Sequence, residues 1–188
     1  MSEKIITSKS NPARLCYVSA FTPRSAKEDG SDPKYSVCVL IPKKDTETIN
    51  EINRAINRIK QDPAALAKWN NKGKVPAGLS TPLRDGDEER PDDPAFAGMM
   101  FLNANSKNKP GIIDADRMAI LDPNELYSGC YGRVSFNLYP YNANGNKGIA
   151  AGLNNIQKLA EGERLSGGST AEEDFADDDD DNTIDPLS

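Results

Sequence analysis

Residues 127–141, YSGCYGRVSFNLYPY, show the clearest structural pattern in this sequence. Successive side chains of a β-strand point to opposite faces, so Val134, Phe136 and Leu138 share one face. The other face carries polar and aromatic side chains, namely Tyr131, Arg133, Ser135, Asn137, Tyr139 and Tyr141. The alternation predicts a strand with one face in a hydrophobic core and the other at a surface.

Other segments on both sides of this strand also have β character. ARLCYVSAF (13–21) and KYSVCVLI (34–41) are separated by turn-forming polar residues, and the second alternates with period two. Further strands are predicted in AGMMFLNAN (97–105), GIIDADR (111–117) and residues 148–159. The fold class is therefore mainly β, and we expect a small barrel.

One substantial helix interrupts the strands. Asp45 or Thr46 can cap it, and the apolar residues that follow recur at helical spacing. These residues are Ile49, Ile52, Ile56 and Ile59. Residues 62–95 follow as a long insertion dense in Pro, Gly and charge, with one short helix near 64–69. A loop of this length in a compact domain is usually functional or mobile.

The charge of the chain is divided unevenly. The net charge is −6, but residues 165–188 hold nine acids and no Lys or Arg, which leaves residues 1–164 with a net charge of +3. We expect one folded domain over residues 1–165 and a disordered acidic tail over 166–188, because the tail has little apolar content to bury. A basic body with an acidic tail points toward nucleic-acid handling.

The polar face of the 131–141 strand suits single-stranded nucleic acid. Unpaired bases stack on aromatic rings while cations hold the backbone, so Tyr131, Tyr139 and Tyr141 are predicted to stack and Arg133 to neutralise phosphate. The alternative is that these tyrosines cover the barrel or line a protein interface. Further candidate phosphate contacts are Lys107, Lys109, Arg117, Lys147, Arg14, Lys34, Arg84 and Arg90.

The residue types present exclude several enzyme classes. The chain has no His, so His-dependent triads and the usual zinc sites are excluded. Cys16, Cys38 and Cys130 are predicted to be core residues in a reducing compartment. We expect no enzyme activity, no cofactor and no metal. The weaker alternative is a Mg²⁺-dependent nuclease that uses clustered carboxylates, Asp85, Asp87, Glu88, Asp92, Asp93, Asp114, Asp116 and Asp122.

The chain also carries no apolar run long enough to span a bilayer and no secretory signal at its start. No membrane association is expected, and the predicted location is cytoplasmic.

Four stretches together resemble a phage-encoded single-stranded DNA-binding family, formerly catalogued as a domain of unknown function. They are residues 81–98, 103–117 and 121–163, with ARLCYVSAF and KYSVCVLIPK near the start. The resemblance covers about residues 8–165 and implies an OB-fold, a partly open five-stranded barrel that binds single strands across one face. It also implies a location in the cytoplasm of an infected bacterial host.

The predicted function is sequence-tolerant binding of single-stranded DNA in phage replication or recombination, with weak duplex binding. The acidic tail is predicted to occupy the binding groove when DNA is absent and to recruit replication or recombination proteins. The tail residues for this role are Glu172, Glu173, Asp174, Phe175, Asp177, Asp178, Asp179, Asp180, Asp181, Asp185 and Leu187. A strand-annealing recombination mediator is the alternative binding function.

Overall fold

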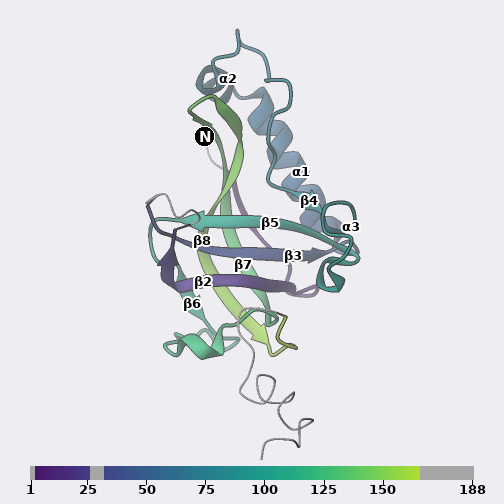
Figure 1. The fold of residues 1–188 in the computed structure, drawn as a ribbon, viewed down its shortest axis with the longest axis vertical. Helices are drawn as coiled ribbons and strands as arrows, with labels where there is room; N and C mark the ends of the chain where they lie inside the picture. The colour runs from purple at the N-terminus through teal and green to yellow at the C-terminus, as the bar shows by residue number, and fades with distance from the viewer. Residues whose placement is uncertain (1–2, 26–31, 166–188) are drawn as a thin grey trace, which may run out of the picture.

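The structure is a computed structural model, and it describes residues 3–25 and 32–165. Strands dominate it, as predicted (Figure 1). The predicted tail, residues 166–188, lies outside the described residues. In chain order the elements are β1 (Glu3–Ile6), β2 (Ala13–Arg24), β3 (Lys34–Pro42), α1 (Thr46–Gln61), α2 (Pro63–Trp69), β4 (Arg84–Asp85), α3 (Gly86–Glu89), η1 (Pro94–Phe96), β5 (Met99–Ser106), β6 (Gly111–Ile113), η2 (Pro123–Glu125), β7 (Tyr131–Ala143) and β8 (Asn146–Ala160).

Five of these strands form a closed ring of pairings. β7 pairs with β2, β2 with β3, β3 with β5, β5 with β8, and β8 returns to β7. The β5–β8 pairing is parallel and the other four are antiparallel. A sheet closed in this way is a small barrel whose interior is filled by side chains.

Three short strands lie outside the ring. β1 adds to β7, β6 adds to β8 and β4 adds to β5. Sequence analysis did not predict β1 or β4, which are four and two residues long. It also overestimated β6: the strand ends at Ile113, and the next residues form a turn in which Asp114 accepts hydrogen bonds from the amides of Asp116 and Met118. Arg117, predicted in a strand, has a φ of 65° in this turn.

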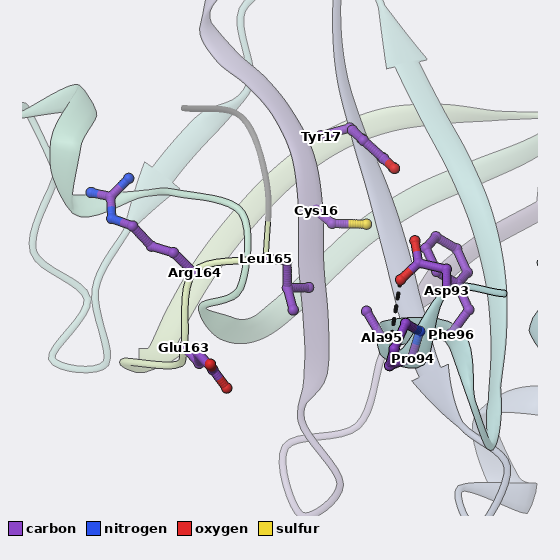
Figure 2. A pocket seen from close by; sticks show the side chains of 9 residues that line it. All are labelled: Cys16, Tyr17, Asp93, Pro94, Ala95, Phe96, Glu163, Arg164 and Leu165. Atoms are coloured by element: carbon purple, nitrogen blue, oxygen red, sulfur yellow. Dashed lines mark hydrogen bonds between the residues drawn. The ribbon is translucent and has the colours of Figure 1, made fainter. Parts of the chain in front are cut away.

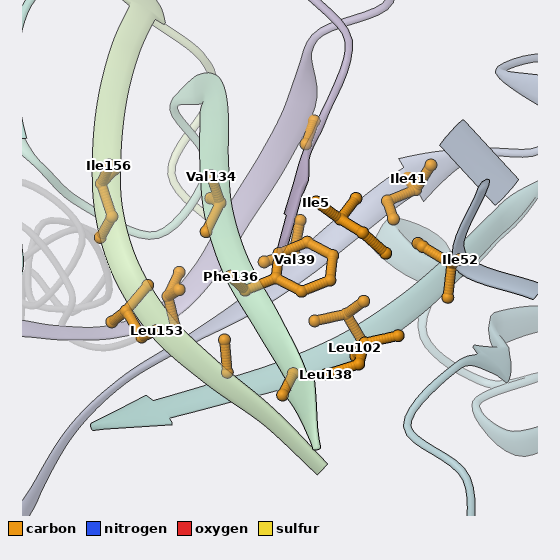
Figure 3. Close-up of a cluster of buried hydrophobic side chains, with 14 of the residues drawn as sticks. Ile5, Val39, Ile41, Ile52, Leu102, Val134, Phe136, Leu138, Leu153 and Ile156 are labelled. Atoms are coloured by element: carbon orange, nitrogen blue, oxygen red, sulfur yellow. The ribbon is translucent and has the colours of Figure 1, made fainter. Parts of the chain in front are cut away.

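The core lies inside the ring, as the alternation of β7 predicted. Val134, Phe136 and Leu138 are fully buried and meet Val39 and Leu102 from the opposite strands (Figure 3). Burying such side chains contributes about 1.5–3 kcal/mol each. Ser135, which the alternation placed at the surface, is only 9% exposed.

Helix α1 covers this core from one side and packs against β1 and β7. Its N-cap is Asp45, whose Oδ1 accepts from the Thr48 amide at 3.2 Å. Ile52, Ile56 and Ile59 are buried as predicted. The helix therefore begins where the capping pattern placed it and buries the face that the isoleucine spacing indicated.

The β7–β8 hairpin is longer than the barrel and projects beyond it toward α2 (Figure 1). Trp69 of α2 is fully buried, and its Nε1 donates to the Gly148 carbonyl at 3.1 Å. The Ser80 amide donates to the Lys147 carbonyl at 3.2 Å, and the Ile149 amide donates to the Ser80 carbonyl at 2.8 Å. The predicted loop of residues 62–95 thus contains α2, β4, α3 and η1, and its first part supports the hairpin.

Candidate nucleic-acid interface

The outer face of β2, β3 and β5 is hollowed around one aromatic side chain, Tyr17. Three adjoining cavities share Tyr17, and we call them together the Tyr17 groove. The largest has a volume of about 530 Å³. The residues that line the groove are Cys16, Tyr17, Val18, Ser19, Arg24, Ser25, Asp32, Lys34, Ser36, Asp93, Pro94, Ala95, Phe96, Asn105, Lys107, Pro123, Asn124, Leu126, Tyr127, Ser128, Glu163, Arg164 and Leu165.

A β-bulge places Tyr17 in this groove. Cys16 lies opposite Cys38 and Ser19 lies opposite Ser36, so two residues of β2, Tyr17 and Val18, face a single residue of β3. The bulge keeps Cys16 and Tyr17 on the outer face, whereas regular alternation would send one of them inward. Val18 packs instead against the core. Bulges redirect side chains in this way and are common beside functional sites.

The backbone at Tyr17 is strained. Its φ is 48°, in the left-handed region that a residue with a bulky side chain rarely adopts. A glycine would take this conformation without the steric cost. The Tyr17 side chain is also 48% exposed, so burial in the core does not compensate for the strain. Strain of this kind persists mainly at functional sites, which indicates that the ring is presented for a ligand.

A guanidinium group lies between Tyr17 and a second ring. The Arg90 guanidinium carbon is 6.0 Å from the centre of the Tyr17 ring and 5.1 Å from that of Phe96. Figure 2 shows Tyr17 directed toward the side of the cavity formed by Asp93 and Phe96. The flat guanidinium thus occupies a place beside the tyrosine where a planar base could also stack.

Cations lie along the rest of the groove. Arg24 is exposed where β2 ends, Lys34 is exposed where β3 begins, and Lys107 follows β5. The Lys107 ammonium is 3.6 Å from an Asp32 carboxylate oxygen, but both side chains are at least 70% exposed, so the pair is weak. Ser19, Ser36 and Asn105 form a polar row between these cations and Tyr17. The result is a polar, basic channel with an aromatic ring near its middle.

The floor of the groove contains two facing thiols. Cys16 and Cys38 lie opposite each other on β2 and β3 and are 2% and 3% exposed. A hydrogen bond between them lowers the pKa of Cys16 and raises that of Cys38. They pack with Leu40, Phe96 and Phe101 in a small apolar cluster on the outer face. Cys130 is also buried, so all three cysteines are core residues, as predicted.

The chain that leads to the acidic tail is fixed at the edge of the groove. Residues 161–165 cross the turn before β7, where a Cβ at Gly129 would lie only 1.9 Å from the Glu163 carbonyl oxygen. The Leu165 amide donates to the Ser128 carbonyl at 3.0 Å, and Leu165 packs against the apolar cluster of the groove floor. We call residues 161–165 the strap.

Side chains hold the strap from both sides. Arg14 donates to the carbonyl oxygens of Gly129 and Glu163 at 3.1 and 2.8 Å. The Lys158 ammonium and the Tyr127 hydroxyl both donate to the Glu161 carboxylate, which lowers the pKa of Glu161. The last described residues before the acidic segment therefore have a defined position at the groove.

The structure brings four of the predicted basic residues to the Tyr17 groove or its margin. Lys34 and Lys107 line it, Arg90 stacks on Tyr17, and Lys109 lies 5.4 Å from the ring of Phe21 in β2. Arg14 lies nearby, but its hydrogen bonds hold the strap. Sequence analysis missed Tyr17, Arg24 and Arg164.

The other predicted residues lie elsewhere. Tyr131 lines a separate cavity next to Arg14, and the Arg133 Nε donates to the Thr7 carbonyl. Tyr139, Tyr141 and Lys147 lie on the β7–β8 hairpin. Arg84 is 3.7 Å from a Glu89 carboxylate oxygen, and Arg117 lies in the turn after β6. The predicted site is thus divided between at least two regions of the molecule.

Several of the acidic residues considered for a nuclease have structural partners. Lys43 bonds to Asp85 and Asp87 at 3.0 and 2.7 Å, and this pairing lowers the pKa of both carboxyl groups. Asp93 and Asp122 cap the short helices η1 and η2. Within residues 3–25 and 32–165, no group of three or more Cys, Asp or Glu side chains is placed to hold a metal ion. In the same part of the chain, no helix is long and apolar enough to cross a membrane.

A closed barrel of five strands with a basic, aromatic groove across one face has the architecture of single-stranded nucleic-acid-binding proteins. The comparisons with known proteins specify the family. Residues 3–184 match the family of the ssDNA-binding protein of Enterobacter phage Enc34, and the chain belongs to that family. The resemblance to a phage single-stranded DNA-binding family, inferred from the sequence, is therefore confirmed.

Individual relatives agree with this assignment. Protein p50 of Acyrthosiphon pisum secondary endosymbiont phage 1 is 33% identical over 171 residues, which cover 87% of this chain and 88% of p50. The single-stranded DNA-binding protein from bacteriophage Enc34, solved in complex with ssDNA, is 25% identical with a TM-score of 0.71; the match covers 88% of this chain and 89% of that one. The single-stranded DNA-binding protein gp2.5 of bacteriophage T7 shares the fold at 18% identity, with a TM-score of 0.61 and coverage of 98% and 99%.

Proposed function

We propose that this protein binds single-stranded DNA without sequence preference, and that the strand runs through the Tyr17 groove. The single observation that carries this proposal is the exposed, backbone-strained Tyr17 at the meeting point of three cavities, two of which are lined by more basic than acidic side chains. The Enc34 relative, solved in complex with ssDNA, supports the same class of ligand.

The groove residues then have distinct roles. Tyr17 stacks on a base, which contributes about 1–3 kcal/mol. Arg90 either stays on the outer side of that base or moves aside to admit it. Arg24, Lys34 and Lys107 neutralise phosphates, and the release of their counterions makes binding sensitive to salt.

The preference for single strands follows from stacking of unpaired bases on the ring of Tyr17. Bases in a duplex keep their faces stacked inside the helix, so Tyr17 has nothing to stack on, while the cations still attract phosphate. Duplex binding is therefore weak and more sensitive to salt than single-strand binding.

The acidic tail regulates this site in the proposed function. Leu165, at the end of the strap, lines the groove, and nine acids follow it in sequence. Competition between tail and DNA for the cations of the groove follows from their opposite charges. Once DNA displaces the tail, the tail recruits replication or recombination proteins in the cytoplasm of the infected bacterial host. Removal of residues 170–188 should raise single-strand affinity at low salt. Unchanged affinity would contradict the competition.

The proposal is tested by titrating a labelled single strand of about 30 nucleotides, and its duplex, with the full chain over a salt series. Mg²⁺ is present, and the strand is checked for length afterwards. Tight, salt-sensitive binding to an intact single strand, with weaker duplex binding, is the expected result. Absence of binding would contradict the proposed function, and a shortened strand would favour the nuclease alternative.

A further inference from the structure

A second basic surface lies far from the Tyr17 groove, at the end of the molecule where α2 meets the tip of the β7–β8 hairpin (Figure 1). Residues 63–84, which include α2, and residues 138–150, which include the hairpin tip, contain no Asp or Glu. Lys68, Lys72 and Lys74 lie on α2 and the turn after it, and Lys147 lies on the hairpin tip. We call these four residues the distal lysines.

Hydrogen bonds hold the two lysine-bearing segments together. The Asn142 side-chain amide donates to the Lys68 carbonyl at 3.1 Å, and the Ser80 amide donates to the Lys147 carbonyl at 3.2 Å. Buried Trp69 fixes α2 to the hairpin through the Gly148 carbonyl. Lys68 and Lys147 therefore project from a rigid support, and Lys72 and Lys74 lie in the turn that follows α2.

The charges of the distal lysines are available for a ligand. Lys68, Lys72 and Lys74 are exposed and Lys147 is half-buried. Across residues 3–25 and 32–165, none of the four forms an ion pair with a carboxylate. Four such cations, with Asp62 at the N-cap of α2 as the nearest acid in sequence, create a local positive potential in a chain whose net charge is −6.

We propose that the distal lysines bind the phosphate backbone of a second single strand while the first strand occupies the Tyr17 groove. This inference rests on the proposed function. The surface matches a backbone-only contact, because it presents charge without a free, strained ring like Tyr17. Two separate sites would let one molecule hold two strands together, which is the physical requirement for bringing complementary strands into register.

The test uses the full chain and two dT30 strands, one with a donor dye and one with an acceptor dye, at low salt. Energy transfer between the dyes reports a second strand held beside the first. In the test variant the four distal lysines are changed together: Lys68→Glu, Lys72→Glu, Lys74→Glu and Lys147→Glu. The matched control carries Arg at the same four positions. Affinity for a single dT30 is measured for each protein as the check on folding and on the first site.

The glutamate variant is expected to keep its affinity for one dT30 within about threefold and to weaken capture of the second strand by about tenfold or more, since four phosphate contacts are lost. The arginine control should behave like the wild-type protein. Unchanged capture of the second strand would overturn the inference. An equal loss at both steps would also overturn it, because the distal lysines would then belong to the first site. If capture of a labelled duplex fell while capture of the second dT30 did not, the single-strand ligand would be wrong. Failure of the wild-type protein to bind the first strand would instead overturn the proposed function.

Discussion

Three tyrosines of this protein lie in two contrasting settings, Tyr17 in the groove and Tyr139 and Tyr141 on the β7–β8 hairpin. On the hairpin, a Cβ at Gly152 would meet the Tyr139 ring at 3.3 Å, and a Cβ at Gly148 would meet the Tyr141 hydroxyl at 2.6 Å. These rings cover glycines of the neighbouring strand, which is a structural use of an aromatic side chain. Tyr17 is not among the nearest neighbours of any glycine within residues 3–25 and 32–165, and it is held in a strained conformation. Aromatic density along a strand therefore does not by itself locate a binding site.

The largest expected difference between the two regions is electrostatic. Changing Arg24, Lys34 and Lys107 to Glu should lower affinity for a single dT30 by about 100-fold or more, because three phosphate contacts become repulsive. Filter binding or fluorescence anisotropy over a salt series would measure this, and the slope of log affinity against log salt should become shallower. A variant with three of the distal lysines changed, Lys68→Glu, Lys72→Glu and Lys74→Glu, is the control, because it changes the net charge by the same amount. Equal losses in both variants would remove the distinction between the regions.

The second difference concerns the ring of Tyr17. Tyr17→Ala should lower single-strand affinity by about 1–3 kcal/mol, which is about 5- to 150-fold. Tyr17→Gly should lose the same affinity, yet leave the free energy of unfolding unchanged or higher, because glycine adopts a φ of 48° without steric strain. Denaturant unfolding and anisotropy together separate binding from stability. Full affinity in the alanine variant would show that the strand passes elsewhere.

The strap gives a third comparison, between two glycines with positive φ. Gly129→Ala places a Cβ against the Glu163 carbonyl and should cost about 1–3 kcal/mol of stability, as expected for strain in a packed turn. Gly145→Ala, at the hairpin tip, meets no atom within 4 Å and carries only the backbone penalty of about 1 kcal/mol. Thermal unfolding of the two variants measures the difference. Similar melting temperatures would mean that residues 161–165 are not held firmly.

Much of the fold could be predicted because its signals are local. The isoleucine spacing located α1, and the alternation in residues 131–141 gave the buried face of β7. The positions of the groove residues, which come from several strands, could not be predicted in the same way. Regular alternation in ARLCYVSAF puts Tyr17 on the face of Leu15, and only the one-residue register shift against β3 turns it outward. That shift depends on pairing between strands, which a single strand does not encode.

The basic residues also show that a site formed by strand pairing cannot be derived from one segment of the sequence. Lys34 and Lys107 are 73 positions apart in sequence and meet only because β3 and β5 pair, with Tyr35 opposite Ser106. Arg14 and Arg133 look identical to them as exposed cations in the sequence, but hydrogen bonds to main-chain carbonyls give both a structural role. The sequence identifies the candidate cations, but strand pairing determines which of them lie on the same surface.

The smallest expected effect is that of Tyr139→Ala on single-strand affinity, and it distinguishes most clearly whether the hairpin belongs to the binding site. Tyr139 is 38% exposed on β7 and was predicted to stack on a base, whereas Tyr17, at 48%, was not identified. If the ring of Tyr139 mainly covers Gly152, Tyr139→Ala should change single-strand affinity by less than about twofold and should lower stability by about 0.2–1 kcal/mol, as for other cross-strand pairs. The same titration used for Tyr17→Ala measures it. A loss of about 1–3 kcal/mol in a folded variant would place a base on β7. The bound strand would then have to run from the outer face of β2–β3–β5 around to the hairpin, and the two regions would be parts of one continuous site.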